Sequence, residues 1–179
     1  MNSTMGTVQR IRSGGQTGVD RAALDWAIAN SIEYCGWCPA GRRSDDGQIP
    51  ARYKLVETPS AGYKERTLLN IRDSDATLII NIGELSGGTK LTHASALKMN
   101  KPVFVFGSEA ITDVSAAAAD SLLQWLFTHN VQTLNVAGPR ERKTPGIYNF
   151  TLGLLSATQQ QHEECRDVAS HTQRPKYTF

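Results

Sequence analysis

Cysteine, net charge and long apolar runs are all scarce in this sequence, and each shortage excludes a class of protein. Only three residues are cysteine, Cys35, Cys38 and Cys165, and the formal net charge is +2. So few cysteines, in an odd number, argue against a disulfide scaffold and favour a reducing, cytoplasmic compartment. The small charge, without a basic run that contains aromatic residues, argues against a nucleic-acid partner. No apolar run is long enough to cross a bilayer, and residues 1–6 lack the apolar part of a signal peptide, so we expect no membrane partner.

The composition that remains is that of an ordinary globular protein. Apolar residues make up 40% of the chain and charged residues 20%, which is typical neither of disordered chains nor of membrane proteins. No linker or internal repeat divides the sequence. We therefore expect a single ligand-binding domain over residues 1–165, followed by a polar and loose C-terminal tail over residues 166–179.

Short apolar runs alternate with longer segments of helical periodicity. The runs at 76–82 and 103–106 are apolar on both faces, as central strands of a parallel sheet are. This alternation predicts an α/β fold, a Rossmann-like doubly wound three-layer sandwich with a mainly parallel sheet. Strands are expected at 8–11, 32–37, 53–58, 76–82, 103–106 and 133–137, helices at 17–30, 63–72, 89–99, 114–129 and 147–164, and a polar loop at 39–52.

The first of two glycine-rich loops follows the first expected strand and reads Ser13-Gly14-Gly15-Gln16-Thr17-Gly18-Val19-Asp20. Free backbone N–H groups at the start of a helix suit an anion, and glycine lets a ligand approach the backbone. Thr17 and Asp20 have the spacing of a capping box. A well-capped turn would explain Thr17 and Asp20 but not the Gly-Gly-Gln before them, so the pattern favours anion binding. It is neither a Walker A motif nor the Rossmann fingerprint.

The second glycine-rich loop, Ser86-Gly87-Gly88-Thr89, follows the apolar strand at 76–82 and also opens a helix. The hydroxyl of Thr89 or Thr92 is a candidate donor to an anion. Ligands of such sheets bind beyond the carboxyl ends of the strands. If the two preceding strands are neighbours, the two glycine loops meet at one site there.

Arg66 and Asn70 share one face of the expected helix at 63–72. An arginine close to the glycine loops would hold an oxyanion with two hydrogen bonds. From the residues alone, a solvated charged face on which Arg66 pairs with Glu65 is the simpler interpretation.

The cysteines have two chemical interpretations. Cys35-Gly36-Trp37-Cys38 has the spacing of a redox motif, and with His162 and Cys165 it has the composition of a zinc site. No helix start follows the first pair, and the two pairs come from distant segments. Core packing and loop placement are therefore the favoured roles of Cys35 and Cys38, and we expect no metal.

Several stretches together resemble the molybdenum carrier family, relatives of molybdenum cofactor carrier proteins. The matching stretches lie at 13–25, 36–43, 63–75, 87–89, 134–140 and 145–148. The resemblance implies a carrier of molybdenum cofactor or molybdate, or of another phosphorylated or oxyanionic small molecule, that forms a homo-oligomer, a dimer or tetramer. The residues we predict to bind the ligand are Ser13, Gly14, Gly15, Gln16, Thr17, Gly18, Asp20, Arg21, Arg42, Arg66, Asn70, Ser86, Gly87, Gly88, Thr89 and Thr92.

That family is similar in turn to the cytokinin-activating phosphoribohydrolases, formerly described as lysine decarboxylases. Arg66 stands nine positions before Asp75-Ala76, where those enzymes have an arginine. Their glutamate is absent, because Ala94 or Thr92 occupies its position in the two possible alignments. We therefore favour a binding protein and predict no catalytic residue. A phosphoribohydrolase-like enzyme and a sensor of a nucleotide-derived ligand remain the alternatives.

Overall fold

The computed structural model of the protein describes residues 5–108 and 114–172. Its central sheet has five parallel strands in the order β2-β1-β9-β7-β8, which confirms the predicted Rossmann-like α/β fold. The strands of this sheet are β1 (Arg10–Arg12), β2 (Glu33–Cys35), β7 (Ala76–Ile82), β8 (Val103–Ser108) and β9 (Thr133–Ala137).

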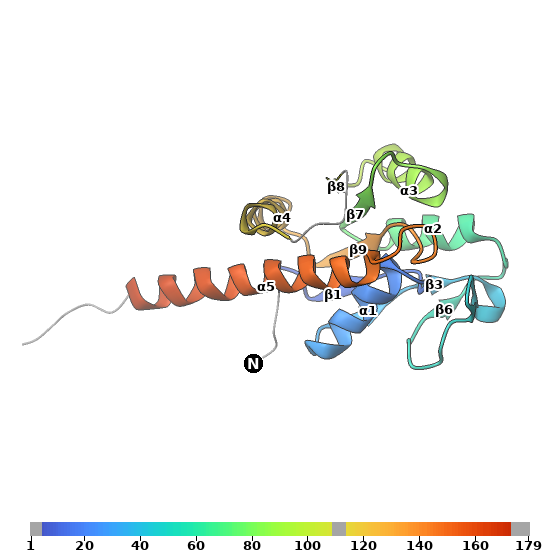
Figure 1. Ribbon diagram of the computed structural model, residues 1–179, viewed down its shortest axis with the longest axis horizontal. Coiled ribbons are helices and arrows are strands. Elements are labelled where there is room, and N and C mark those ends of the chain that lie inside the picture. The colour runs from blue at the N-terminus through green and yellow to red at the C-terminus, as the bar shows by residue number, and fades with distance from the viewer. Residues whose placement is uncertain (1–4, 109–113, 173–179) are drawn as a thin grey trace, which may run out of the picture.

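Within the described residues, five α-helices cover the two faces of the sheet. They are α1 (Val19–Ala29), α2 (Tyr63–Arg72), α3 (Gly87–Lys98), α4 (Ala116–Thr128) and α5 (Ile147–Thr172). Helix α5 packs between α1 and α4, whereas α2 and α3 pack against each other. The main core lies between the sheet and the α1–α5–α4 layer, around Leu78, Ile80, Leu122, Leu134 and Leu154. The C-terminal part of α5 runs out beyond the rest of the molecule (Figure 1).

The expected polar loop at 39–52 is partly ordered into small elements. A 3₁₀ turn η1 (Ala40–Arg42) precedes a hairpin of β4 (Arg43–Ser44) and β5 (Gly47–Gln48). The expected strand at 32–37 divides at Gly36, so that β3 (Trp37–Cys38) leaves the main sheet and pairs with β6 (Val56–Glu57). A small second core of Leu24, Cys38, Ile49, Tyr53 and Leu55 fixes this region against α1.

Two expectations about the chain differ from the structure. Strand β9 lies between β1 and β7, so the strands before the two glycine loops are not neighbours. Helix α5 continues to Thr172, so the first part of the expected loose tail is helical, while residues 173–179 lie outside the described residues. Within the described part of the chain, no helix is both long and apolar enough to cross a membrane.

Candidate functional site

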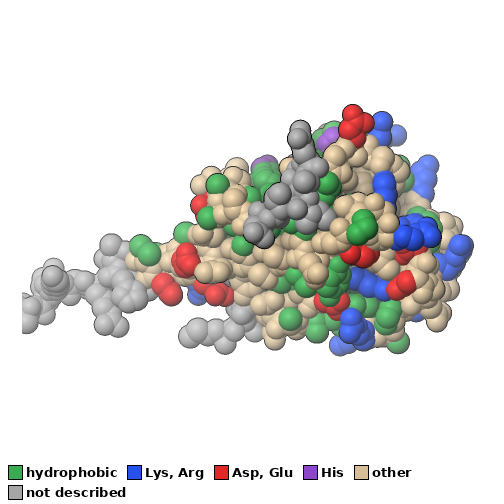
Figure 2. Space-filling view, in the orientation of Figure 1, with side chains coloured by type: hydrophobic (Ala, Val, Ile, Leu, Met, Phe, Trp, Pro, Cys, Tyr) green, Lys and Arg blue, Asp and Glu red, His purple; other side chains and the backbone are tan. Residues whose placement is uncertain are grey.

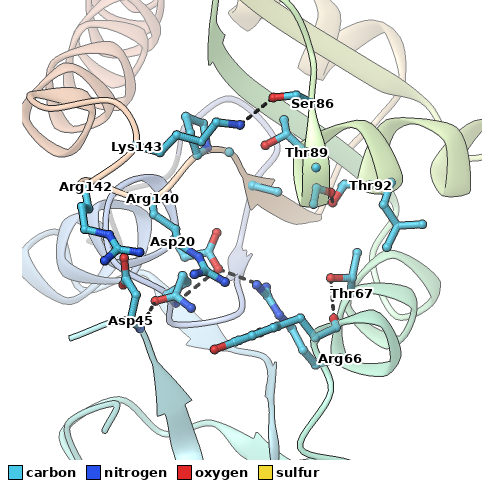
Figure 3. A pocket seen from close by; sticks show the side chains of 18 residues that line it. Asp20, Asp45, Arg66, Thr67, Ser86, Thr89, Thr92, Arg140, Arg142 and Lys143 are labelled. Carbon is cyan, nitrogen blue, oxygen red and sulfur yellow. Dashed lines mark hydrogen bonds and ion pairs between the residues drawn. The ribbon is translucent and has the colours of Figure 1, made fainter. Parts of the chain in front are cut away.

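A cleft of about 470 Å³ opens at the carboxyl edge of the sheet. Three loops meet there, after β1, β7 and β9, and α2 closes one side (Figure 3). The two glycine loops therefore face the same space even though β9 separates their strands. The residues that line the cleft are Gln16, Asp20, Asp45, Tyr63, Arg66, Thr67, Ser86, Gly87, Gly88, Thr89, Leu91, Thr92, Ala137, Gly138, Pro139, Arg140, Arg142 and Lys143.

The charged lining of the cleft is mostly basic. Four cationic side chains face two carboxylates, and three of the cations come from the loop after β9: Arg140, Arg142 and Lys143. Figure 2 shows that Lys and Arg side chains gather mostly at the end of the molecule opposite the projecting end of α5. A concave site with this balance attracts anions.

The loop after β9 is held in place by Glu141 and by its own backbone. The Glu141 carboxylate accepts hydrogen bonds from the backbone N–H groups of Gly146 and Tyr148, at 2.6 and 2.9 Å. The Arg140 carbonyl accepts from the N–H groups of Lys143 and Thr144. The basic side chains of this loop are thus presented by a folded turn at the start of α5. Lys143 Nζ also donates to Ser86 Oγ at 2.5 Å, which links the loop to the start of α3 (Figure 3).

The N-terminus of α3 is open to an anion. Ser86 is its N-cap residue, but the Ser86 side chain makes no capping hydrogen bond. The first N–H groups of a helix have no partner within it, and here Gly87, Gly88 and Thr89 line the cleft. The positive end of the helix dipole adds to the basic side chains around it.

The N-terminus of α1, by contrast, is already occupied by groups of the protein. The N–H of Gln16 donates to Asp20 Oδ2 at 3.3 Å, and the N–H of Val19 points to the Pro139 carbonyl at 3.4 Å. The N-cap residue is Gly18, with no side-chain cap, and the Thr17 hydroxyl donates to Asp45 Oδ1 at 2.7 Å. The predicted capping box of Thr17 and Asp20 is therefore wrong. The carboxylate of Asp20 stands where the sequence suggested an anion.

Arg66 reaches across the cleft to Asp20. Its Nη1 lies 3.1 Å from Asp20 Oδ2, and the two side chains are only 15% and 4% exposed. Glu65 instead accepts a hydrogen bond from the backbone of Ser60. The interpretation of Arg66 as part of a solvated face is thus wrong. Burial raises the pKa of the Asp20 carboxyl above its ordinary 3.8, while the charge of Arg66 acts in the opposite direction.

Gln16 presents a buried amide at the same place. Its Oε1 accepts from the backbone N–H groups of Thr17 and Asp45, at 3.1 and 2.9 Å. Because both of these groups are donors, the amide orientation is fixed and its NH₂ group must point elsewhere. Gln16 is only 4% exposed, and its Nε2 has no hydrogen-bond partner among the described residues. A buried donor of this kind needs an acceptor from water or from a ligand.

The other predicted residues of the first loop support the fold around the cleft. Gly14 gives room to the Arg66 guanidinium, because a Cβ there would overlap it. Gly15, at φ +75°, faces Ile49 and Leu55 of the second core instead of the cleft. We expected a ligand to approach the backbone at Gly15, but this position is covered by the second core. Gly18 lies against the backbone of the loop after β9.

Four predicted polar residues have partners outside the cleft, and each holds a part of the fold. The Ser13 hydroxyl donates to the Val136 carbonyl. The Asn70 side chain bonds both the N–H and the C=O of Trp37. Arg21 and Arg42 make larger sets of contacts. Arg21 donates to Asp46, Ser44 and the Gly15 carbonyl. Arg42 donates to four backbone carbonyls, those of Ile49, Pro50, Tyr53 and Leu55.

The predicted residues that do line the cleft are Gln16, Asp20, Arg66, Ser86, Gly87, Gly88, Thr89 and Thr92. The Thr92 hydroxyl donates to the Gly88 carbonyl at 2.9 Å. The sequence interpretation missed the basic residues Arg140, Arg142 and Lys143 as ligand-binding candidates. The sequence does contain a signal for them, because they follow Gly138-Pro139, which begins the loop after a buried strand whose carboxyl end was expected at the ligand edge.

The three cysteines are free thiols. Cys38 is buried in the second core, Cys35 is half-buried and Cys165 is exposed on α5. No group of three or more His, Cys, Asp or Glu side chains suitable for a metal occurs within residues 5–108 and 114–172.

The fold and the cleft define a Rossmann-like three-layer protein with a basic cleft at the carboxyl edge of its sheet. The sequence matches the circularly permutated YpsA SLOG family over residues 11–159, and the chain belongs to that family. A crystal structure of a protein from Syntrophus aciditrophicus SB, described as "Putative molybdenum carrier protein", is similar with a TM-score of 0.82 and 44% sequence identity. The match covers 86% of this chain and 96% of that one, and it confirms the resemblance to molybdenum carriers. No curated protein matches the sequence.

Proposed function

We propose that this chain is a carrier that binds a phosphorylated or oxyanionic small molecule in the cleft, with molybdenum cofactor or molybdate as the cargo. The observation that carries the proposal is the convergence of the open α3 N-terminus with Arg140, Arg142 and Lys143 on one concave site. Its volume lies in the range of ligand pockets. The similarity to a protein described as a molybdenum carrier supports the choice of cargo.

The anionic part of the ligand is assigned to the α3 side of the cleft. Backbone N–H groups at 87–89 and the Thr89 hydroxyl would donate to its oxygens, and the side chains of Arg140, Arg142 and Lys143 would neutralise its charge. Molybdenum cofactor is a pterin with a terminal phosphate and a molybdenum oxyanion head, so it has two anionic parts. The Asp20 carboxylate disfavours a second anion at the start of α1.

Identification of the small molecule that co-purifies with the protein tests this function. Denaturation of the wild-type protein is expected to release a phosphorus- or molybdenum-containing compound, with a fluorescent pterin in the case of molybdenum cofactor. The variant Arg140→Ala/Arg142→Ala is expected to lose it. An equal amount of the compound from both proteins would place the ligand outside the cleft.

A phosphoribohydrolase-like enzyme is the second candidate, and one observation favours it. The glutamate of the related enzymes is missing, but the Asp20 carboxylate contacts Arg66 from another element. A carboxylate beside an arginine is able to activate water for cleavage of an N-glycosidic bond. Incubation with nucleoside monophosphates decides between the candidates: the carrier releases no free base, whereas turnover that is lost in Asp20→Asn would establish the enzyme.

We also propose a cytoplasmic homo-oligomer. The apolar surface expected at Trp125-Leu126-Phe127 is smaller than its sequence suggests, because Leu126 is buried and Trp125 packs on Phe104 with ring centres 5.4 Å apart. Phe127 is 48% exposed and remains available for contact. Light scattering at micromolar concentration is expected to give a dimer or tetramer, and a monomer would refute this part of the proposal.

A further inference from the structure

The cleft has two ends of different chemistry. The α3 side carries the basic loop and open N–H groups, whereas the α1 side carries the Asp20 carboxylate and the Gln16 amide. An anionic group of a ligand would be poorly matched to the α1 side, because it would face a carboxylate. The α1 side is instead suited to a neutral group.

Asp20 supplies an acceptor at this end. Both hydrogen-bond partners of its carboxylate among the described residues, Arg66 Nη1 and the Gln16 N–H, bind the same oxygen, Oδ2. Oδ1 therefore remains able to accept from an N–H group of a ligand. In Figure 3 the Asp20 side chain rises into the cleft between Arg140 and Arg66. A carboxylate that accepts from a neutral N–H makes a hydrogen bond stronger than one between two neutral groups.

Gln16 supplies a donor next to this acceptor. Its Nε2 is buried and has no partner among the described residues, and the two bonds to Oε1 prevent the amide from turning over. The loss of solvation at Nε2 is recovered only when an acceptor reaches it. The backbone of Gln16 donates to Asp20, so this donor and the acceptor belong to one fixed turn.

A flat surface lies beside them. The Arg140 guanidinium stands 4.9 Å from the centre of the Tyr63 ring, both residues line the cleft, and the charge of Arg140 also acts on the Asp20 carboxyl, so this arginine serves both ends of the cleft. A planar heterocycle would stack on such a pair.

We propose that the α1 side of the cleft recognises the 2-amino-4-oxopyrimidine edge that pterins share with guanine. Asp20 Oδ1 accepts from the ring N–H or the amino group, and Gln16 Nε2 donates to the carbonyl oxygen. This inference rests on the proposed function, because the phosphate of the same ligand binds at the α3 side. It assigns a neutral ring to the end where the sequence suggested a second anion.

Calorimetric titration with GMP, AMP and orthophosphate tests the assignment. GMP and AMP carry the same phosphate and sugar, but AMP lacks the carbonyl and the ring N–H donor. The wild-type protein is expected to bind GMP roughly 10-fold or more tightly than AMP, the size of one hydrogen bond to a charged group. Gln16→Glu keeps the acceptor for Thr17 and Asp45 but removes the donor, and Asp20→Asn removes the carboxylate. Each is expected to bring the GMP-to-AMP ratio close to one.

The control is Asp75→Asn. The Asp75 carboxylate is exposed and lies away from the cleft, and like the Asp20 carboxylate it accepts hydrogen bonds from backbone N–H groups, those of Gln132 and Thr133. This variant is expected to keep the wild-type ratio. Equal binding of GMP and AMP by the wild-type protein, or an unchanged ratio in both cleft variants, would overturn the inference. If the inference fails in this way but orthophosphate still binds, and Arg142→Ala weakens that binding, the proposed function is supported without the recognition of the ring. If none of the three compounds binds at millimolar concentration, both proposals fail.

Discussion

Arg66 and Asp20 form a buried ion pair between α2 and α1, with Nη1 and Oδ2 3.1 Å apart. The pair lies in the lining of the cleft and joins the start of α1, beside the first glycine loop, to the helix that carries Arg66. Because both side chains are largely withdrawn from water, each depends on the other for compensation of its charge. This contact explains why a carboxylate is tolerated within a basic site.

The first prediction concerns the pH dependence of stability. Since burial raises the pKa of Asp20 above 3.8, the folded state holds this proton more tightly than the unfolded state. The free energy of unfolding should therefore fall as pH rises through 3.8 toward the higher folded pKa. The side chain of Asp20→Asn does not titrate, so this variant does not show the fall in the free energy of unfolding that Asp20 causes. Although Asp20→Asn also leaves Arg66 without its carboxylate, urea unfolding between pH 3 and 8 should show the wild-type free energy of unfolding falling relative to that of Asp20→Asn as pH rises above 3.8. A difference in the free energy of unfolding between the two proteins that is the same at every pH would contradict the raised pKa of Asp20.

The second prediction concerns Arg66→Ala. Its removal leaves the Asp20 carboxylate buried without its cation, and breaking such a pair costs about 3–5 kcal/mol. The loss of unfolding free energy should be largest near neutral pH and smaller at acid pH, where Asp20 is protonated. The double variant Asp20→Asn/Arg66→Ala should recover part of it. If Arg66→Ala is as stable as the wild type at pH 7, the pair is not a stabilising contact.

The third prediction concerns Gly14. A Cβ at this position would overlap the Arg66 guanidinium, the far end of a flexible side chain that is able to move away. Gly14→Ala should therefore separate Arg66 from Asp20 while the fold is kept, and it should lower the free energy of unfolding near neutral pH as Arg66→Ala does. Urea unfolding of both variants tests this. Wild-type stability in Gly14→Ala would mean that the loop adapts without moving Arg66.

The fourth prediction concerns the exposed cation Arg142. Arg142→Ala should leave the melting temperature unchanged and weaken anion binding about 10-fold or more, because one hydrogen bond between charged groups is lost. The difference should shrink as salt rises, since exposed charges are screened. Arg166→Ala, a matched loss of an arginine on the projecting part of α5, should bind like the wild type. Equal losses in both variants would indicate a general charge effect only.

The sequence predicted most elements of the fold because their signals are local. The expected bounds of α2, β7 and β9 agree with the structure. The position of β9 between β1 and β7 was not predictable, because strand order depends on contacts between distant segments. For the same reason Glu65, the nearest carboxylate in sequence, was the expected partner of Arg66. The actual partner, Asp20, comes from the first glycine loop, 46 residues earlier in the sequence.

The candidate site was predicted in part. The second glycine loop opens a helix at the cleft as expected, whereas the N–H groups at 16 and 19 already bind protein groups. Gly-Gly at 14–15 reads as an anion loop in sequence, but Gly14 makes room for Arg66 and Gly15 packs on the second core. Such uses of glycine depend on tertiary neighbours and carry no local pattern.

The position of a bound oxyanion tests the central claim most directly. Tungstate has the shape and charge of molybdate, and its tungsten atom is located by anomalous scattering in a crystal of the protein. We predict a single strong peak in the cleft, between the N-terminus of α3 at Gly87–Thr89 and the side chains of Arg140 and Arg142. A peak at the start of α1, a peak outside the cleft, or no peak at millimolar tungstate would contradict the account.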